Sequence, residues 1–170
     1  MPRNIEIKAR VHSMPELRQR ASSLADTGPT EIAQDDTFFN CDRGRLKLRA
    51  FSPSRGELIF YRRADASGPK ESFYVLAPTA DPDGLREALT LAYGQAGRVI
   101  KQRTLFLAGR TRIHLDRVKD LGDFMELEVV LDDGESNEEG FAEATSLMER
   151  LGIHKSHLIE GAYLDLLAAR

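Results

Sequence analysis

The stretch Arg3 to Val11, which reads RNIEIKARV, decides the fold. Its apolar residues alternate with polar ones, so one face of a strand is apolar and the other carries an amide, a carboxylate and two cations. Most later strand-like segments repeat the pattern: GRLKLRA, LIFYRR, RVIKQRTLFL, RTRIHLD and FMELEVV. A sheet with one apolar and one charged face can close into a barrel with a polar lumen. The sequence therefore predicts such a barrel.

The composition fits one globular domain spanning residues 1–170. The chain is 41% hydrophobic and 30% charged, which is ordinary for a folded domain. Its formal net charge is -3. A general nucleic-acid binder normally carries an excess of basic residues, so this balance argues against that class and predicts no nucleic-acid partner.

The single cysteine, Cys41, excludes an internal disulfide and favours a reducing compartment. No apolar run approaches the roughly 20 residues that a membrane-spanning helix needs. The N-terminal stretch also lacks the apolar core of a signal peptide. We therefore expect a cytoplasmic protein with no membrane partner.

Helix signals separate the strands. Ser13 with Glu16 forms a capping-box pattern, and we expect the helix that it starts to end at residues 28–29, Gly-Pro. Further helix starts are expected at Asp81 and Ser136. A last helix is expected from about Ser156, although Gly161 weakens it. About eight strands with these helices predict an α+β fold, namely a closed eight-stranded antiparallel β-barrel with flanking helices.

Strand parity indicates which side chains share the lumen, because alternate residues fall on one face. The predicted set is Asn4, Glu6, Lys8 and Arg10 in the first strand; Arg45, Lys47 and Arg49 in the third; Arg62, or else Arg63, in the fourth; Lys70 in the fifth; Lys101 and Arg103 in the sixth; Arg112, His114 and Asp116 in the seventh; and Glu126 and Glu128 in the eighth.

Converging cations need an anion, because unpaired buried charges are very costly. The basic residues of this set outnumber the acidic ones, and a triphosphate would balance the excess. The carboxylates would then hold Mg²⁺ or Mn²⁺, hard cations that take oxygen ligands and bridge to phosphate. The alternative is a barrel whose charges face solvent and pair across strands. For any single charged strand segment the solvent-facing alternative is favoured. For six segments with charges on the same parity it is the less favoured interpretation.

Two further residues have structural interpretations. His114 is predicted to be a core or rim histidine rather than a metal ligand, because no second histidine stands at metal-ligand spacing. Tyr163 is predicted to take part in helix packing.

These tracts resemble the CYTH superfamily, the triphosphate tunnel metalloenzymes, over essentially the whole chain. NIEIK is similar to the family's ExExK signature, with Glu6 and Lys8 at its second and third fixed places. QDDTFF, RLKLR and the K-x-R at Lys101 resemble its later strands. Asp116 followed by LGDFMELEV resembles its closing D…G-x-F-x-E-x-E. Asn4 departs from the pattern by replacing the first Glu, so a metal site relying on that carboxylate should be weaker or absent.

The resemblance implies roles for these residues. Glu126, Glu128 and Asp116 would hold the activating Mg²⁺ or Mn²⁺, and Glu6 with Asn4 would hold a second metal or orient the nucleophile. The predicted phosphate-binding residues are Lys8, Arg45, Lys47, Arg49, Arg62, Lys70, Lys101 and Arg103. The predicted catalytic residues are Glu6, Lys8 and Lys101. The family's habit also suggests a homodimer.

Three functions compete. The leading one is a class IV adenylyl cyclase-like enzyme, in which the ribose 3′-hydroxyl attacks the α-phosphate of ATP to give cyclic AMP and pyrophosphate. The second is a hydrolase of thiamine triphosphate, tripolyphosphate or a nucleoside triphosphate. The third, suggested by Asn4, is a non-catalytic nucleotide- or polyphosphate-binding protein. A nucleic-acid-binding barrel is disfavoured by the acidic net charge and by the shortage of aromatic residues on the basic strands.

Overall fold

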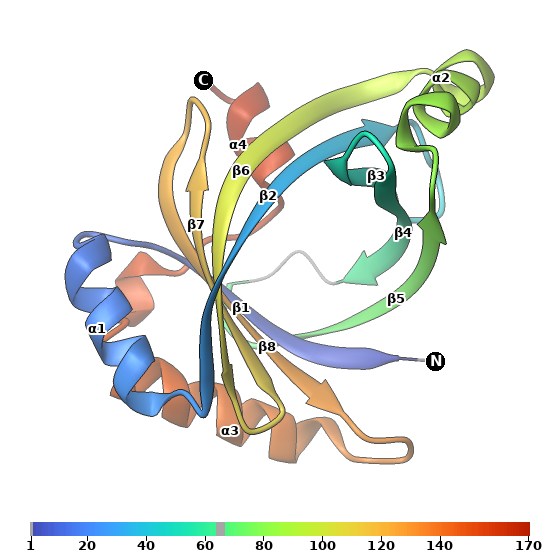
Figure 1. Cartoon of the computed structure of the whole chain (residues 1–170). Coiled ribbons are helices and arrows are strands. Elements are labelled where there is room, and N and C mark those ends of the chain that lie inside the picture. The colour runs from blue at the N-terminus through green and yellow to red at the C-terminus, as the bar shows by residue number, and fades with distance from the viewer. Residues whose placement is uncertain (1, 64–66) are drawn as a thin grey trace.

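The computed structural model, which describes residues 2–63 and 67–170, forms a closed barrel (Figure 1). Its strands are β1 (Arg3–Arg10), β2 (Thr27–Phe39), β3 (Arg45–Ser52), β4 (Arg55–Arg63), β5 (Lys70–Thr79), β6 (Gln95–Ala108), β7 (Thr111–Val118) and β8 (Gly122–Leu131). Around the barrel they run β1-β5-β4-β3-β2-β6-β7-β8, and β8 pairs back with β1. Every pairing is antiparallel, which confirms the predicted fold class.

The helices lie outside the barrel. They are α1 (Met14–Leu24), α2 (Pro82–Tyr93), α3 (Asn137–Arg150) and α4 (Tyr163–Ala168), with a short 3₁₀ turn, η1 (Lys155–His157). Figure 1 shows α1 and α3 flanking the β1–β8 side of the barrel, with α2 at a separate corner. The Ser13 side chain accepts a hydrogen bond from the backbone N–H of Glu16, as the capping pattern predicts. No helix in the described part of the chain is long and apolar enough to cross a membrane.

Two helix boundaries differ from the prediction. The first helix ends at Leu24, and residues 28–29 lie inside β2, next to an irregularity in its pairing with β6. The expected last helix is broken, because Gly161 has a φ of 76° that an α-helix excludes. The chain before it follows β1 instead, with the backbone N–H of Ile159 donating to the carbonyl of Lys8.

The main apolar core lies between the barrel wall and the helices. Ile5, Ile7 and Ala9 on β1 are fully buried there, together with the outward residues of β7 and β8. Leu17 and Ala21 of α1, and Ala144, Leu147 and Met148 of α3, pack against them. Because the apolar face of β1 is occupied in this way, its polar face is left to the lumen.

Gly140 marks the closest approach of α3 to the barrel. A Cβ added there would lie 2.6 Å from Ile5 Cγ1 and 2.7 Å from Leu131 Cδ2. Gly140→Ala should therefore lower the free energy of unfolding by about 1–2 kcal/mol through overpacking. At an exposed helical position the same change from glycine to alanine would instead raise it by about 1 kcal/mol. Urea denaturation measures the change, with Ser146→Ala on the exposed face of α3 as the control. A stabilised Gly140→Ala variant would contradict this close packing.

Candidate functional site

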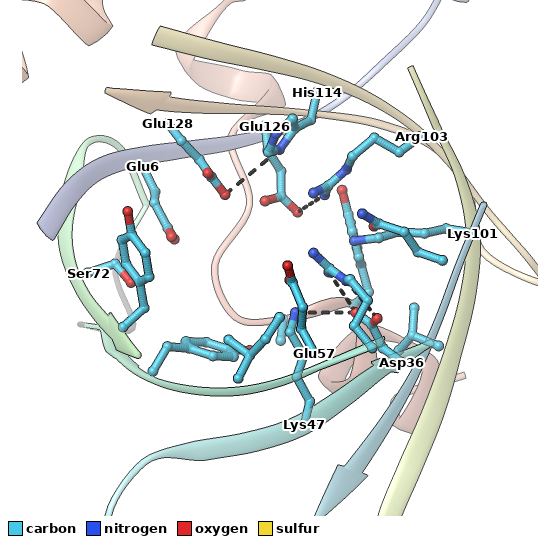
Figure 2. Close-up of a pocket in the computed structure, with 18 of the residues that line it drawn as sticks. Glu6, Asp36, Lys47, Glu57, Ser72, Lys101, Arg103, His114, Glu126 and Glu128 are labelled. Atoms are coloured by element: carbon cyan, nitrogen blue, oxygen red, sulfur yellow. Dashed lines mark hydrogen bonds and ion pairs between the residues drawn. The ribbon is translucent and has the colours of Figure 1, made fainter. Parts of the chain in front are cut away.

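The lumen holds a cavity of about 310 Å³, lined by residues from all eight strands and from the start of α4. Charged side chains face one another across it, as Figure 2 shows. The described lining includes seven cationic side chains: Lys8, Lys47, Arg49, Arg63, Lys101, Arg103 and Arg112. It also includes five carboxylates: Glu6, Asp36, Glu57, Glu126 and Glu128. The cations exceed the carboxylates, so the charge of the described lining favours an anion.

The structure brings most of the predicted lumen residues into this cavity. The predicted residues that line it are Asn4, Glu6, Lys8, Lys47, Arg49, Arg63, Lys101, Arg103, Arg112, His114, Glu126 and Glu128. Others lie apart. Arg10 is exposed, and Arg45 pairs with Asp165 of α4 at 2.6 Å. Lys70 lies opposite Glu6 in the β1–β5 register and is 4% exposed, although it is outside the lining.

The prediction that Arg62 points into the lumen is wrong, and Arg63 takes that place. Arg62 is exposed and lies against the Phe60 ring on the outside of β4. The inward residues of β4 include Ile59 and Tyr61, which are apolar or aromatic. The lumen side of this strand also carries Glu57, so its more charged parity does face inward, and Arg62 is the one charge on the outer side.

Glu126, Glu128 and His114 form a cluster on one wall of the cavity. One ligand atom from each lies within 4.8 Å of those from the other two. Burial opposes ionisation of Glu126, but Lys8, Lys101 and Arg103 lower its pKa well below the usual range. Burial likewise opposes ionisation of Glu128, while His114 and Arg112 lower its pKa to about 2. Both carboxylates are therefore charged at neutral pH.

The same wall has unused ligand atoms. Burial, reinforced by Arg103, lowers the pKa of His114 to about 4, so its imidazole is neutral and can donate a lone pair to a metal. Among the described residues, His114 Nδ1 and Asn4 Oδ1 have no hydrogen-bond partner although both are buried. Buried polar atoms are normally satisfied. The cluster therefore fits a divalent cation, and Asn4 on β1 presents a buried neutral oxygen to the same cavity.

Two arginines are fixed by buried aspartates on the adjacent strands. Arg49 donates two hydrogen bonds of 2.8 Å to Asp36, its direct neighbour in the β2–β3 register. Arg103 donates two bonds of 2.8 Å to Asp116 across the β6–β7 pair. Such bidentate pairs hold the guanidinium plane in one orientation. Each pair leaves Nη1 of the arginine outside it.

Asp116 is placed differently from the metal ligand that its resemblance implied. It is fully buried, outside the cavity lining and outside the Glu126–Glu128–His114 cluster. Its oxygens accept from Arg103 and from the hydroxyl of Tyr163, at 2.9 Å, and Lys101 lies 3.5 Å away. This arrangement makes Asp116 a positioning residue for the cations rather than a metal ligand.

The C-terminal segment completes the site. The carbonyl of Gly161 accepts from Lys8 Nζ at 3.1 Å and from Arg63 Nη2 at 2.6 Å. The Tyr163 ring centre lies 4.2 Å from Lys8 Nζ and 4.8 Å from Lys101 Nζ, within cation–π range. Tyr163 therefore contacts the cations of the lumen in addition to packing.

Glu6 faces the cluster from β1. It lies opposite Glu128 in the β1–β8 register and pairs with Arg63 at 3.1 Å. Burial and the neighbouring Glu128 raise its pKa, and the Arg63 guanidinium only partly offsets them.

Burial together with the adjacent Arg49 lowers the pKa of Lys47 to about 7, even though Asp36 lies 3.2 Å away. Burial also lowers the pKa of Lys8 to about 8. The cationic side of the cavity therefore loses charge as the pH rises above neutral.

Comparison with known proteins supplies the family. A CYTH domain family model matches residues 2–163. Three solved structures share the fold. The PH1012 protein from Pyrococcus horikoshii has a TM-score of 0.83 at 22% identity, covering 96% of this chain and 98% of that one. A candidate adenylate cyclase from Vibrio parahaemolyticus has a TM-score of 0.79 at 17% identity, covering 97% of each chain. HpAC1 from Hippeastrum, a candidate adenylyl cyclase with a dominant triphosphatase activity, has a TM-score of 0.63 at 16% identity, covering 88% of each chain. A search of curated proteins finds no match.

Asp36 and its neighbour Asp35 provide a matched pair for testing the buried charges. Asp36→Asn leaves Lys47 and Arg49 without their counter-charge, so we expect the free energy of unfolding to fall by about 3–5 kcal/mol. Asp35→Asn breaks only the surface pair with Arg98, which should cost less than about 1 kcal/mol. Urea denaturation in a chloride buffer without phosphate or sulfate makes the comparison. Equal losses in the two variants would contradict the role assigned to Asp36.

Proposed function

The chain belongs to the CYTH domain family, and from this premise we propose that it is a metal-dependent enzyme acting on a triphosphate bound in the barrel lumen. One observation carries the proposal. The buried Glu126–Glu128–His114 cluster faces a set of cations that the neighbouring strands fix in place. Carboxylates suit a hard divalent cation, and arginine and lysine suit phosphate oxygens.

The chain's own residues bind and orient the phosphates. Arg49 and Arg103 are held by their aspartates before any ligand arrives, so little reorganisation is needed when charge develops on the phosphate oxygens. Lys8 and Lys101 approach from β1 and β6, and both amines contact the Tyr163 ring. We assign catalysis to this group, with Glu6 orienting the nucleophile.

The metal would be held by Glu126, Glu128 and His114, with Asn4 as a neutral oxygen donor. When bound, Mg²⁺ or Mn²⁺ supplies charge neutralisation at the phosphate oxygens. This assignment keeps two of the ligands that the resemblance implied, adds His114 and removes Asp116.

The cyclase-like reaction is our leading assignment: the ribose 3′-hydroxyl attacks the α-phosphate, the bond from that phosphorus to the bridging oxygen breaks, and pyrophosphate leaves. Hydrolysis of the terminal phosphate by water is the second candidate. It is favoured by one structural relative, HpAC1, in which triphosphatase activity dominates. The two reactions use the same cations and differ in which phosphorus meets the nucleophile.

A chromatographic product assay decides between these reactions. Purified protein is incubated with ATP, thiamine triphosphate or tripolyphosphate, each with Mg²⁺ or Mn²⁺. Cyclic AMP with pyrophosphate identifies a cyclase, and orthophosphate identifies a hydrolase. Glu126→Gln should lower either rate by a factor on the order of 10² to 10³, whereas Glu138→Gln on the exposed face of α3 should leave it unchanged.

A third outcome would overturn the enzyme assignment. If neither the wild type nor Asn4→Glu, which restores the carboxylate of the family signature, turns over any of these substrates while tripolyphosphate still binds tightly, the protein is a binding module. If Asn4 only weakens the metal site of an enzyme, Asn4→Glu should gain activity. If the protein is a binding module, Asn4→Glu should remain inactive.

The lowered pKa of Lys47 predicts that the affinity for tripolyphosphate depends on pH. Phosphate binding needs the protonated amine, so metal-free affinity for tripolyphosphate should fall as the pH rises through about 7, by up to roughly tenfold per pH unit. Lys47→Arg keeps its charge throughout this range and should flatten the profile near pH 7, leaving the fall that Lys8 causes near pH 8. Isothermal titration calorimetry from pH 6 to 9 measures both proteins, and their ratio cancels the titration of the ligand itself. Parallel profiles would exclude Lys47 as the titrating group.

A further inference from the structure

Three of the four histidines in the chain gather outside the barrel, away from the lumen. His12 lies between β1 and α1, while His154 precedes η1 and His157 is its last residue. In Figure 1 the segment after α3 returns beside α1, which brings these distant parts of the chain together. His12 and His154 are exposed and His157 is half-buried, so solutes can reach all three.

The geometry of this cluster suits a shared ligand. Nε2 of His12 lies 2.9 Å from Nε2 of His157, so one ring nitrogen can donate a hydrogen bond to the other. His154 and His157 are three residues apart on a 3₁₀ turn, where such side chains lie above one another. Their ring centres are 5.4 Å apart, and the exposed His154 ring lies beside the pair.

We propose that His12, His157 and His154 form a binding site for a divalent transition-metal ion of the Cu²⁺ or Ni²⁺ class. Imidazole nitrogens favour these ions over Mg²⁺. With metal–nitrogen bonds of about 2.0–2.1 Å, two ligands at a right angle are about 2.9 Å apart, which is the separation of the two Nε2 atoms. Such a right angle is the arrangement of a tetragonal site. The nearby carboxylate of Glu16 is engaged with Arg20, which leaves the histidines as the donors.

Binding replaces the hydrogen bond between the two rings. Each neutral imidazole binds the metal through Nε2 and carries its one proton on Nδ1, so the contact between His12 and His157 gives way to two metal–nitrogen bonds with no net release of protons. The metal then ties the start of α1 to the segment that follows η1. That segment bridges Ala9 through Leu158 and carries Gly161 and Tyr163 into the lumen. Metal binding would therefore stabilise the position of the segment that carries Gly161 and Tyr163.

Calorimetric titration with Ni²⁺ tests the proposal on untagged full-length protein. Excess Mg²⁺ is present throughout, and the titration is repeated in Glu126→Gln to remove binding at the carboxylate cluster. We expect one Ni²⁺ per chain, a Tm that rises with Ni²⁺ concentration by mass action, and, for neutral imidazole ligands, no net release of protons, measured in two buffers of different ionisation enthalpy. Copper electron paramagnetic resonance should show nitrogen coupling from at least two imidazoles.

Histidine variants distinguish the outcomes. His157→Gln and His12→Gln should each weaken binding at least tenfold, because loss of even an outer-shell partner costs about 10–100-fold in metal affinity. His154→Gln should weaken it less, and Lys155→Gln, on the same exposed turn, should not weaken it. Binding that survives in the His12→Gln/His157→Gln double variant, or no saturable binding by the wild type, would overturn the proposal. Neither result depends on turnover, so the triphosphate assignment is tested separately.

Discussion

The cost of burying charge inside the barrel is the constraint on which the rest of the structure depends. An unpaired ion in such a cavity costs several kcal/mol, so each cation needs a counter-charge at a fixed place. Asp36 and Asp116 supply it for Arg49 and Arg103 through direct cross-strand pairs. Those pairs exist only if β2, β3, β6 and β7 keep one register, so the charge balance and the strand alignment specify each other. The helices can then cover the apolar outer face of β1, β7 and β8.

Alternation along the strands predicted the barrel and much of the site because a period of two assigns each side chain to a face. This worked for Glu6 and Lys8 on β1, and for Lys101 and Arg103 on β6, where every second residue is charged. It failed at Arg62, because Arg62 and Arg63 are adjacent cations and Glu57 is the residue that indicates which parity of β4 faces the lumen. Two adjacent residues of like charge do not by themselves orient a strand.

Side-chain contacts between segments that are distant in the sequence could not be predicted from the sequence alone. His114 is predicted to be a core or rim histidine because no second histidine stands at metal-ligand spacing, whereas its place beside Glu126 and Glu128 depends on the β7–β8 pairing. Asp36 lies within QDDTFF, but its bidentate contact with Arg49 depends on the β2–β3 register. The role of Tyr163 follows from Gly161, whose left-handed backbone breaks the expected helix and turns the chain into the lumen.

The closure of the barrel by β1 also governs how the chain folds. Arg3 pairs with Phe73 on one side and with Leu131 on the other, so the first strand has no sheet partner until much later segments have been synthesised. Such non-local pairing gives a high contact order, and the entropy of closing long loops must be met before the pairing stabilises the chain. Until then, β1 has unpaired backbone groups along its edges and an exposed apolar face. Both can pair with or bind to other chains. Folding of this protein on the ribosome is therefore expected to be delayed until β8 emerges, which makes the nascent chain a natural client for chaperones.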